Sequence, residues 1–293
     1  MLCWKAQEVV VKNIGLIPNW RKKNANLVVA KIDHFFSQRS IELTTADAAR
    51  VDFYSETSLA DQLPEWHESM DLIIVVGGDG TILRVARDLA CWNLPVLGIN
   101  LGHKGFLAEI EVEQMERFLQ YIATDQYTCN ERMMLDTRLR RANQELVAYL
   151  ALNDIVVSRG PFSRIIEVES YINDDFMESY FGDGLIVATP TGSTGYSLSA
   201  GGPIVNPTMQ LFVVTPICPH SLYNRSVIIS GSDLIRLQVD SRQVEVMLTV
   251  DGQVRHNLED GDQIIVKRSE QTVKLVSFQD YTFYRMLHKK LKA

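Results

Sequence analysis

The chain has 293 residues, of which 46% are hydrophobic and 22% are charged, and its formal net charge at pH 7 is −7. This length allows two domains, each with its own hydrophobic core, and the composition is ordinary for a globular protein. The excess of acidic residues offers little to nucleic acid, and no apolar run approaches the roughly 18–20 residues that span a bilayer. We therefore expect small-molecule ligands and neither nucleic-acid nor membrane partners.

The amino-terminal residues and the spacing of the cysteines indicate in which cellular compartment the protein is expected. Residues 1–5 lack a basic segment followed by an apolar one, so we expect no signal peptide. The four cysteines are far apart, at Cys3, Cys91, Cys129 and Cys218. They form no Cys-x-x-Cys pair, and the six histidines show no metal-ligand spacing, which argues against a zinc site and a disulfide framework. The expectation is a cytoplasmic protein with reduced thiols and no metal held by its own side chains.

The first half of the chain alternates between strand-like and helix-like segments. Strands are predicted at 9–11, 41–43, 71–76 and 95–100. Helices are predicted at 25–37, 82–91 and 112–124. This β-α-β-α order indicates a parallel, doubly wound sheet, whose ligands bind at the carboxyl ends of its strands. We predict an amino-terminal α/β domain over residues 1–126.

Short strands at close spacing, with turn residues between them, follow in the second half. They are predicted at 134–139, 146–150, 165–172, 176–181, 184–188, 234–239, 244–250, 263–266 and 272–276. Such a pattern is typical of an antiparallel, all-β domain. We predict a β-rich carboxyl-terminal domain over residues 127–277, and a helical tail, 278–293, that packs back on the first domain.

The most informative motif is Gly77-Gly78-Asp79-Gly80-Thr81, which follows a continuous apolar run typical of a buried parallel strand. Thr81 is expected to cap the next helix, and the glycines would let a phosphate approach the backbone. A carboxylate beside phosphates is costly, so Asp79 is expected to do chemistry or to hold a hydroxyl. The alternative is a plain strand-to-helix turn. Neither a P-loop nor a Gly-x-Gly-x-x-Gly fingerprint is present.

A second unusual stretch is Thr189-Pro190-Thr191-Gly192-Ser193-Thr194-Gly195-Tyr196-Ser197. Its five hydroxyl groups are short hydrogen-bonding groups for phosphate, ribose and base edges, and Tyr196 could stack on a base. The alternative is a surface loop rich in Ser and Thr. Gly201-Gly202-Pro203 follows closely, and ordering so glycine-rich a segment is expensive unless a ligand requires it. The stretch therefore favours a nucleotide-binding loop.

Three further features remain open from the residues alone. Asn153-Asp154 is interpreted as a polar pair in the middle of a strand, where it either occupies a sheet edge or bulge or grips a vicinal diol. Asp251-Gly252 is interpreted as a hairpin turn, and Gly182-Asp183-Gly184 as an ordinary turn. Arg84 and Arg87, on the helix after the glycine turn, are expected to reach solvent or to touch a phosphate.

Together these segments resemble the NAD kinase family. The resemblance rests on six motifs in order, covering about residues 70–255. They are Gly77-Gly78-Asp79-Gly80-Thr81, Leu101-Gly102-His103-Lys104-Gly105-Phe106-Leu107, Asn153-Asp154, Gly182-Asp183-Gly184 with the stretch 189–196, Asn224-Arg225-Ser226-Val227, and Asp251-Gly252. Asp154 stands where the family usually has Glu, and Gly195 where it usually has Ala. Neither change removes a group that the reaction needs, so we expect altered affinity rather than lost activity.

The resemblance implies an α/β domain followed by a β-rich domain. It also implies transfer of a phosphoryl group from ATP, or from another triphosphate or polyphosphate, to the 2′-hydroxyl of the adenosine ribose of NAD. Mg²⁺ would arrive on the donor phosphates rather than on protein ligands. Members of the family are usually dimers or tetramers, so a homodimer or homotetramer is expected.

The reaction needs an acceptor for the hydroxyl proton, and Asp79 is assigned that role as the catalytic residue. Gly77, Gly78 and Gly80 would let the donor phosphates approach. The remaining expected substrate-binding residues are Thr81, Asn153, Asp154, Asp183, Thr191, Ser193, Thr194, Gly195, Tyr196, Ser199, Asn224 and Arg225. Among them, Asn153 and Asp154 would hold ribose hydroxyls or the base. Arg225 and Lys104 are candidate cations for the donor.

Two rival functions remain open. A lipid kinase of the diacylglycerol or sphingosine type also carries a Gly-Gly-Asp-Gly turn, but it would need a pocket for acyl chains and would leave the stretch 189–196 without a use. A non-catalytic dinucleotide-binding sensor would have no need of an acid at position 79. Formation of NADP from NAD, ATP and Mg²⁺ separates the three functions.

Overall fold

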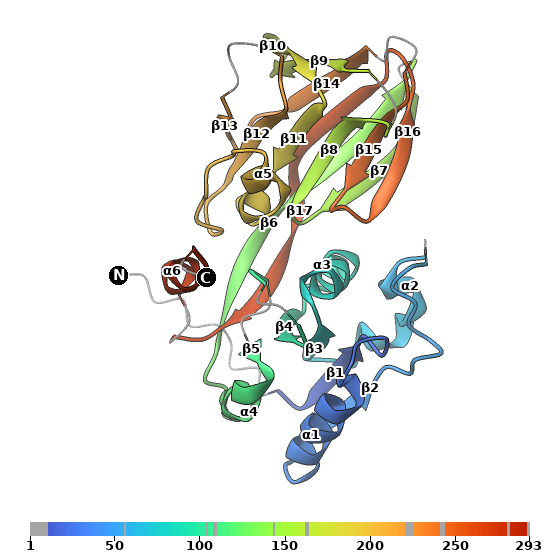
Figure 1. Cartoon of the computed structure of the whole chain (residues 1–293). Coiled ribbons are helices and arrows are strands. Elements are labelled where there is room, and N and C mark those ends of the chain that lie inside the picture. The colour runs from blue at the N-terminus through green and yellow to red at the C-terminus, as the bar shows by residue number, and fades with distance from the viewer. Residues whose placement is uncertain are drawn as a thin grey trace. The chain divides into compact units, whose positions relative to one another are not determined.

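The computed structural model describes residues 11–55, 57–102, 105–107, 110–142, 144–161, 164–220, 225–240, 244–279 and 282–291. The chain divides into two compact units (Figure 1). Unit 1 comprises residues 1–130 and 273–293, and unit 2 comprises residues 131–272. None of the helices in this described part of the chain is both long and apolar enough to cross a membrane. The predicted domain limits, 126/127 and 277/278, stay a prediction.

Unit 1 is an α/β unit. Its strands are β1 (Asn13–Pro18), β2 (Glu42–Thr45), β3 (Leu72–Gly77), β4 (Pro95–Asn100) and β5 (Ile110–Glu111). Its α-helices are α1 (Ala25–Ser37), α2 (Leu59–Gln62), α3 (Asp79–Asp88), α4 (Met115–Ala123) and α6 (Phe283–Leu291). Three 3₁₀ turns are η1 (Pro64–Trp66), η2 (Ala90–Trp92) and η3 (Val112–Gln114).

The sheet of unit 1 is parallel and has the order β2-β1-β3-β4, with β5 and the last residues of β17 (Gln263–Ser277) also paired to β4. Every residue of β3 is buried, as its continuous apolar run predicts. Leu72, Ile74 and Val76 of β3 form one hydrophobic cluster with apolar residues of α1 and α4, including Phe36 and Phe118. The α/β character predicted for the first half is confirmed, and the helix at 25–37 and the strand at 95–100 match the prediction at both ends.

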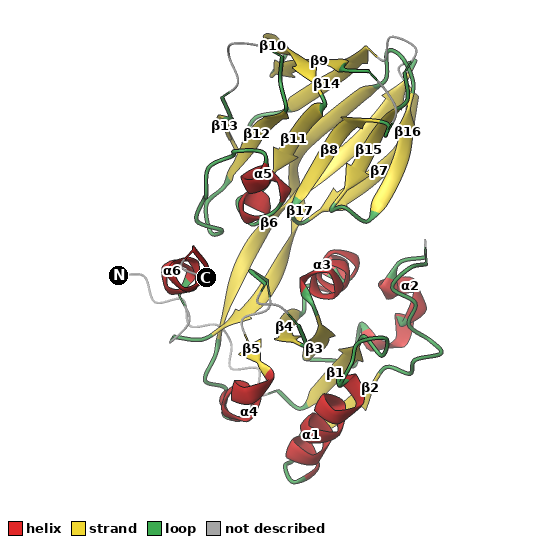
Figure 2. Cartoon of the chain, viewed as in Figure 1, coloured by secondary structure: helices red, strands yellow, loops and turns green. Residues whose placement is uncertain are grey.

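Unit 2 is built almost entirely from strands (Figure 2). They are β6 (Thr128–Arg141), β7 (Gln144–Ala151), β8 (Asp154–Arg159), β9 (Ile166–Ile172), β10 (Asp175–Gly182), β11 (Gly184–Ala188), β12 (Leu211–Ile217), β13 (Val227–Ser230), β14 (Ile235–Asp240), β15 (Val246–Val250), β16 (Val254–Leu258) and the first part of β17. A 3₁₀ turn η4 (Gly192–Thr194) and a short helix α5 (Tyr196–Ser199) follow β11.

One sheet of unit 2 has the order β13-β12-β11-β8-β15-β16 and is antiparallel throughout. Strands β10, β9, β14 and β17 pair in that order, and β6 pairs with both β17 and β7. Side chains from both groups of strands form the main hydrophobic cluster, for example Val157 and Leu248 from the first and Leu237 and Val266 from the second. The β-rich character predicted for the second half is confirmed.

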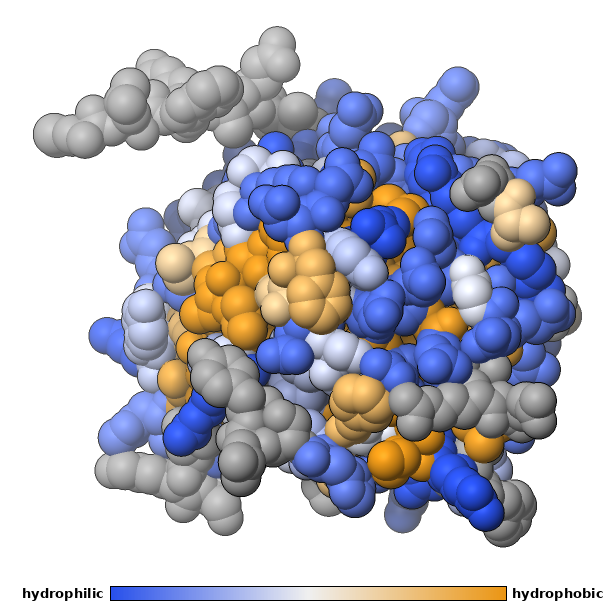
Figure 3. All heavy atoms as spheres, turned by 90° about the horizontal axis from the view of Figure 1, so that it is seen from above, coloured by the Kyte–Doolittle hydropathy of each residue, from blue (hydrophilic) through white to orange (hydrophobic). Residues whose placement is uncertain are grey.

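The surface mixes polar and apolar residues. On the face drawn in Figure 3, apolar side chains gather in small groups among polar ones. Single apolar side chains among polar ones are normal on the surface of a folded protein.

Candidate functional site

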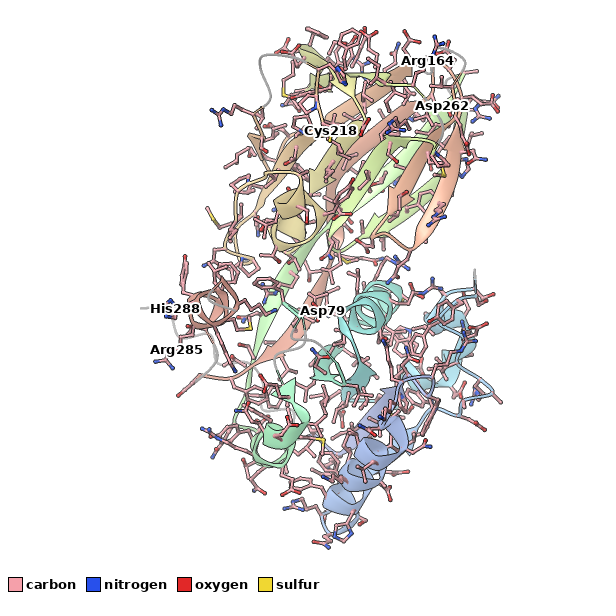
Figure 4. The ribbon with its side chains drawn as sticks, viewed as in Figure 1. Asp79, Arg164, Cys218, Asp262, Arg285 and His288 are labelled. Carbon is pink, nitrogen blue, oxygen red and sulfur yellow. The ribbon has the colours of Figure 1, made fainter. Side chains whose placement is uncertain are left out.

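Asp79 is the first residue of α3, directly after β3 and Gly78, so it lies at the carboxyl end of a parallel strand (Figure 4). The backbone N–H of Phe106 donates to Oδ2 of Asp79 at 2.7 Å, and that of Leu107 donates to the same oxygen at 3.5 Å. The partial positive charge at the start of α3 also favours a carboxylate there. The fold therefore holds an oriented carboxylate where open α/β sheets bind their ligands.

Three glycines around Asp79 differ in how much space their neighbours leave for a side chain. A Cβ on Gly105 would overlap the carboxylate of Asp79, and a Cβ on Gly77 would lie 2.6 Å from the Cβ of Thr81. A Cβ on Gly78 would meet nothing within 4 Å. Gly105 and Gly77 are thus required by packing inside unit 1, whereas the space beside Gly78 is open to a ligand.

The predicted helix cap at Thr81 is wrong. The helix begins at Asp79 rather than at residue 82, and Gly78 is the residue before it, with no side-chain cap. The hydroxyl of Thr81 instead accepts a hydrogen bond from Nδ2 of Asn19 at 3.0 Å. Thr81 therefore ties α3 to the end of β1, and we assign it a role in positioning the turn.

The prediction that Arg84 and Arg87 reach solvent is also wrong, since both side chains are buried. Nε of Arg84 lies 2.6 Å from Asp88, and its Nη2 donates to the carbonyls of Ser55 and Thr57. Apolar spacing on a helix does not reveal such a cation, because its burial depends on partners that lie almost thirty residues away in the chain.

A pocket of about 560 Å³ opens on unit 2. It is lined by Asn153, Asp154, Val156, Ser158, Pro161, Tyr196, Met247, Thr249, Asp251, Gly252 and Arg255. Three residues predicted to bind substrate, Asn153, Asp154 and Tyr196, thus meet in one cavity. Tyr196 is 48% exposed, which leaves its ring available for stacking on a base.

The strand pairing explains the other lining residues. Residues 154, 156 and 158 alternate along β8 with Ile155 and Val157, which lie in the hydrophobic cluster. In β15, Met247 and Thr249 alternate in the same way with core residues, and Thr249 pairs with Val156 and with Arg255 of β16. This alternation turns the other face of each strand away from the main hydrophobic cluster, and Val156 on that face is buried in a smaller cluster. The motifs did not identify Met247, Thr249 or Arg255 as pocket residues. These residues belong to no motif, and they line the pocket only because β15 and β16 pair beside β8.

Asp251 forms the hairpin turn that its motif predicts, and its side chain has a further structural role. The turn is present, with Asp251 and Gly252 at φ 51° and 66° between β15 and β16. In addition, the Asp251 carboxylate accepts hydrogen bonds from the backbone N–H groups of Leu152 at 3.0 Å, Asn153 at 2.7 Å and Asp154 at 3.2 Å. Asp251 thereby fixes the backbone of the Asn153-Asp154 pair.

The sequence predicts that the Asn153-Asp154 pair lies in the middle of a strand, and this prediction is wrong. It forms the junction between β7, which ends at Ala151, and β8, which begins at Asp154. Oδ1 of Asn153 is buried and has no hydrogen-bond partner among the described residues. A buried, unpaired amide oxygen is costly, so it favours a ligand that donates to it.

Asp154 is 5% exposed. Burial, and to a smaller extent the charge of Asp251, raises the pKa of Asp154 from 3.8 to about 7. A carboxyl in this state donates a hydrogen bond when protonated and accepts hydrogen bonds when ionised, so either form can recognise a hydroxyl.

This pKa makes a prediction for stability. Between about pH 4 and pH 7 the folded chain binds a proton at Asp154 that the unfolded chain has lost, so stability falls as pH rises, by about 1.4 kcal/mol per pH unit. Asp154→Asn removes this dependence. We expect the melting temperature to rise at both pH values, by about 5–10 °C more at pH 8 than at pH 5, because two further pH units of this loss lie between them. An equal shift at both pH values would contradict the prediction.

The stretch 189–197 folds against the backbone of Asn153. Oγ1 of Thr189 donates to the carbonyl of Leu152 at 2.6 Å, and the N–H of Gly192 donates to Oγ1 of Thr189 at 3.1 Å. A Cβ on Gly192 would overlap the carbonyl of Asn153. The glycine and one hydroxyl thus serve the packing of the loop rather than a ligand.

The other hydroxyls of this stretch differ in availability. Oγ of the fully buried Ser193 donates to the carbonyl of Pro190 at 2.7 Å and accepts from the N–H of Val205 at 3.0 Å. Oγ1 of Thr194 donates to the carbonyl of Thr191 at 3.3 Å. Oγ1 of Thr191 is buried with no hydrogen-bond partner in the described part of the chain.

Of the remaining predicted residues, Asp183, Ser199 and Arg225 are described by the structure and do not line the pocket. Ser199 and Arg225 are exposed, and Asp183 pairs with Arg159, whose Nε lies 2.6 Å from Oδ1 of the carboxylate. Lys104 and Asn224 lie outside the described residues.

Comparisons with known proteins agree with this fold and these motifs. Residues 14–127 match the family model of the ATP-NAD kinase N-terminal domain, and residues 152–278 match that of the ATP-NAD kinase C-terminal domain. An NAD kinase of Natranaerobius thermophilus is 44% identical over 96% of this chain and 98% of its own length. An NAD kinase of Caldanaerobacter subterraneus subsp. tengcongensis is 40% identical over 96% and 99%.

Solved structures are similar as well. Yeast NADH kinase, determined with NADH, has a TM-score of 0.80 and 26% identity, covering 97% of this chain and 89% of its own. An NAD kinase from Archaeoglobus fulgidus, determined with ATP, has a TM-score of 0.72 and 26% identity, covering 96% and 98%. The family models and these relatives define a nucleotide-dependent phosphotransferase. The chain belongs to the ATP-NAD kinase family.

Proposed function

We propose that this chain transfers the γ-phosphoryl group of ATP to the 2′-hydroxyl of the adenosine ribose of NAD, forming NADP. The observation that carries the proposal is the orientation of Asp79, whose Oδ2 accepts the N–H of Phe106 at the carboxyl end of β3. The transfer needs an aimed hydroxyl and an acceptor for its proton. Asp79 is the residue assigned to accept that proton.

The pocket of unit 2 is assigned to the dinucleotide. Asn153 and Asp154 would bind ribose hydroxyls or the base, and the exposed ring of Tyr196 would stack on the base. The buried oxygens of Asn153 and Thr191, unpaired among the described residues, support a ligand here. Thr194, Gly195 and Ser199 complete this proposed region, and Asp183 and Arg225 are proposed to contact other parts of the nucleotides.

The donor is proposed to enter as a complex of a divalent cation with ATP. The described residues contain no group of three His, Cys, Asp or Glu side chains that could hold a metal ion, so the protein atoms do not fit a cage for a resident metal. Mg²⁺ would then arrive bound to the donor phosphates. A homodimer or homotetramer in the cytoplasm remains our proposal for the assembly and its location.

Purified protein incubated with NAD, ATP and Mg²⁺ tests the function directly. We expect NADP to accumulate, and parallel reactions with NADH and with polyphosphate define the acceptor and the donor. Phosphorylation of a diacylglycerol or sphingosine substrate instead would identify a lipid kinase. Nucleotide binding without any product would identify a sensor.

Gly195 offers a test of the pocket. Its φ of −93° lies outside the left-handed region, and a Cβ there would lie 3.7 Å from Asp154 Oδ2 and 3.8 Å from Asn153 Nδ2. The same Cβ would lie 3.2 Å from the carbonyl of Gly192, which has to give way by a few tenths of an ångström. The methyl group of Gly195→Ala therefore adds contact area beside both polar groups. We expect the KM for NAD to fall about fourfold, the value of one buried methylene, with kcat unchanged. A KM that stays the same or rises would argue against adenosine in this pocket.

A further inference from the structure

The tail helix α6 brings one cation to the surroundings of Asp79, within unit 1. Nζ of Lys290 lies 3.6 Å from the centroid of the Phe106 ring. This nitrogen is buried and has no hydrogen-bond partner among the described residues. Burial lowers the pKa of Lys290 to about 8, while the negative charge of Asp79 acts to raise it. The ammonium of Lys290 and the carboxylate of Asp79 thus interact electrostatically.

Phe106 connects the two charged groups. Its backbone N–H holds the Asp79 carboxylate at 2.7 Å, and its ring lies against the Lys290 ammonium. Gly105, the preceding residue, has no room for a Cβ because of the Asp79 carboxylate. The segment 105–107 therefore places an anion and a cation near each other.

Lys289, the neighbour of Lys290, forms an ordinary surface ion pair. Nζ of Lys289 lies 3.2 Å from Oε1 of Glu111, and its side chain is 55% exposed. The ammonium of Lys290 is instead shielded from solvent and forms no hydrogen bond with the described residues. A desolvated ammonium has three donors to satisfy, and the contact with an aromatic ring replaces only part of that loss. An anionic ligand with several oxygens would satisfy them.

We propose that Lys290 binds the phosphoryl donor, its ammonium contacting a phosphate oxygen beside Asp79. This inference rests on the proposed kinase function. The sequence has no P-loop and hence no P-loop lysine, yet the charge on the transferring group has to be neutralised. A cation held near the proton acceptor meets that need, and it also offsets the repulsion between Asp79 and the incoming phosphates.

Lys290→Met tests the proposal, because methionine keeps an unbranched side chain of similar length against the Phe106 ring but has no charge. We expect the KM for ATP to rise at least tenfold, the KM for NAD to change less than twofold, and kcat/KM for ATP to fall about 100-fold. Lys290→Arg should restore a substantial part of ATP binding. Lys289→Met, on the same helix, is the matched control and should leave both KM values unchanged.

Two measurements separate this role from a structural one. Calorimetric titration with Mg²⁺-ATP in the absence of NAD should show the same loss of affinity for Lys290→Met. Thermal unfolding should show a melting temperature equal to or above that of the wild type, since the variant removes a buried charge that has no hydrogen-bond partner in the described structure. A lower melting temperature with unchanged ATP affinity would assign Lys290 to folding and overturn the proposal.

The results for the wild type and for Lys290→Met distinguish an error in the proposed kinase activity from an error in the role of Lys290. If the wild-type chain forms no NADP from ATP and NAD, the proposed function fails. If the wild type forms NADP and Lys290→Met has a normal KM for ATP, only the assignment of Lys290 is wrong. An equal rise in the KM values for ATP and NAD would also contradict a specific contact with the donor.

Discussion

Asp79→Asn is expected to lower kcat for NADP formation by about 10²–10⁴-fold, the usual contribution of a general base. The amide cannot take the proton of the 2′-hydroxyl. Its carbonyl oxygen can still accept the N–H of Phe106, so the turn after β3 should keep its conformation. The lost charge at the start of α3 costs about 0.3–1 kcal/mol of stability.

The variant therefore separates chemistry from binding and folding. Steady-state rates measure kcat, equilibrium dialysis with NAD measures acceptor binding, and thermal unfolding checks the fold. We expect NAD binding to change less than threefold. The matched control is Asp33→Asn, the same substitution at an exposed position of α1, which should not affect the rate. Turnover by Asp79→Asn near the wild-type rate would show that Asp79 is not the proton acceptor.

Asp251→Ala is expected to have the largest effect on stability. The substitution removes the acceptor of three backbone N–H groups at residues 152–154 and leaves them without a partner in a buried region. Alanine also fits poorly at a φ of 51°. We expect the free energy of unfolding to fall by about 3–5 kcal/mol, measured by urea denaturation.

Two further variants isolate the cause of that loss. Asp251→Asn tolerates the left-handed backbone and keeps one acceptor oxygen, so its loss should be about half as large. Asp174→Ala, at a φ of 74° in the exposed turn between β9 and β10, reports the cost of the backbone conformation alone. If Asp174→Ala lost as much stability as Asp251→Ala, the three hydrogen bonds would not be the reason.

The position of Asp251 also links stability to ligand binding. Its carboxylate fixes the backbone from which Asn153 and Asp154 enter the pocket, and its charge contributes to the raised pKa of Asp154. A variant that stays folded at low temperature should therefore bind NAD more weakly and should titrate Asp154 at lower pH. The proposed nucleotide site depends on a residue whose motif predicts a plain turn.

Much of the architecture could be predicted, because local patterns carry it. The helix α1 and the strand β4 match their predicted ends, and β3 follows from an unbroken apolar run. Predictions failed where polar residues continue a strand. The sequence predicts two strands, at 263–266 and 272–276, but β17 runs unbroken from Gln263 to Ser277. It pairs with β14 at its start, with β4 near its end and also with β6, and such long-range pairing is not visible in a local pattern.

The sequence by itself determined the α/β and β-rich halves, the acid Asp79 after a buried strand, and the membership of a kinase family. Each of these properties follows from local patterns, either the spacing of apolar residues over a short segment or a motif whose residues are adjacent in the chain. The tertiary structure decided which side chains meet. It buried Arg84 with Asp88, joined Asp251 to residues 152–154, and brought Lys290 against Phe106. Apart from the Arg84–Asp88 pair, these contacts join groups that are between 97 and 184 residues apart in the chain. Burial and partners decide the charge of these groups, and no local pattern reports either.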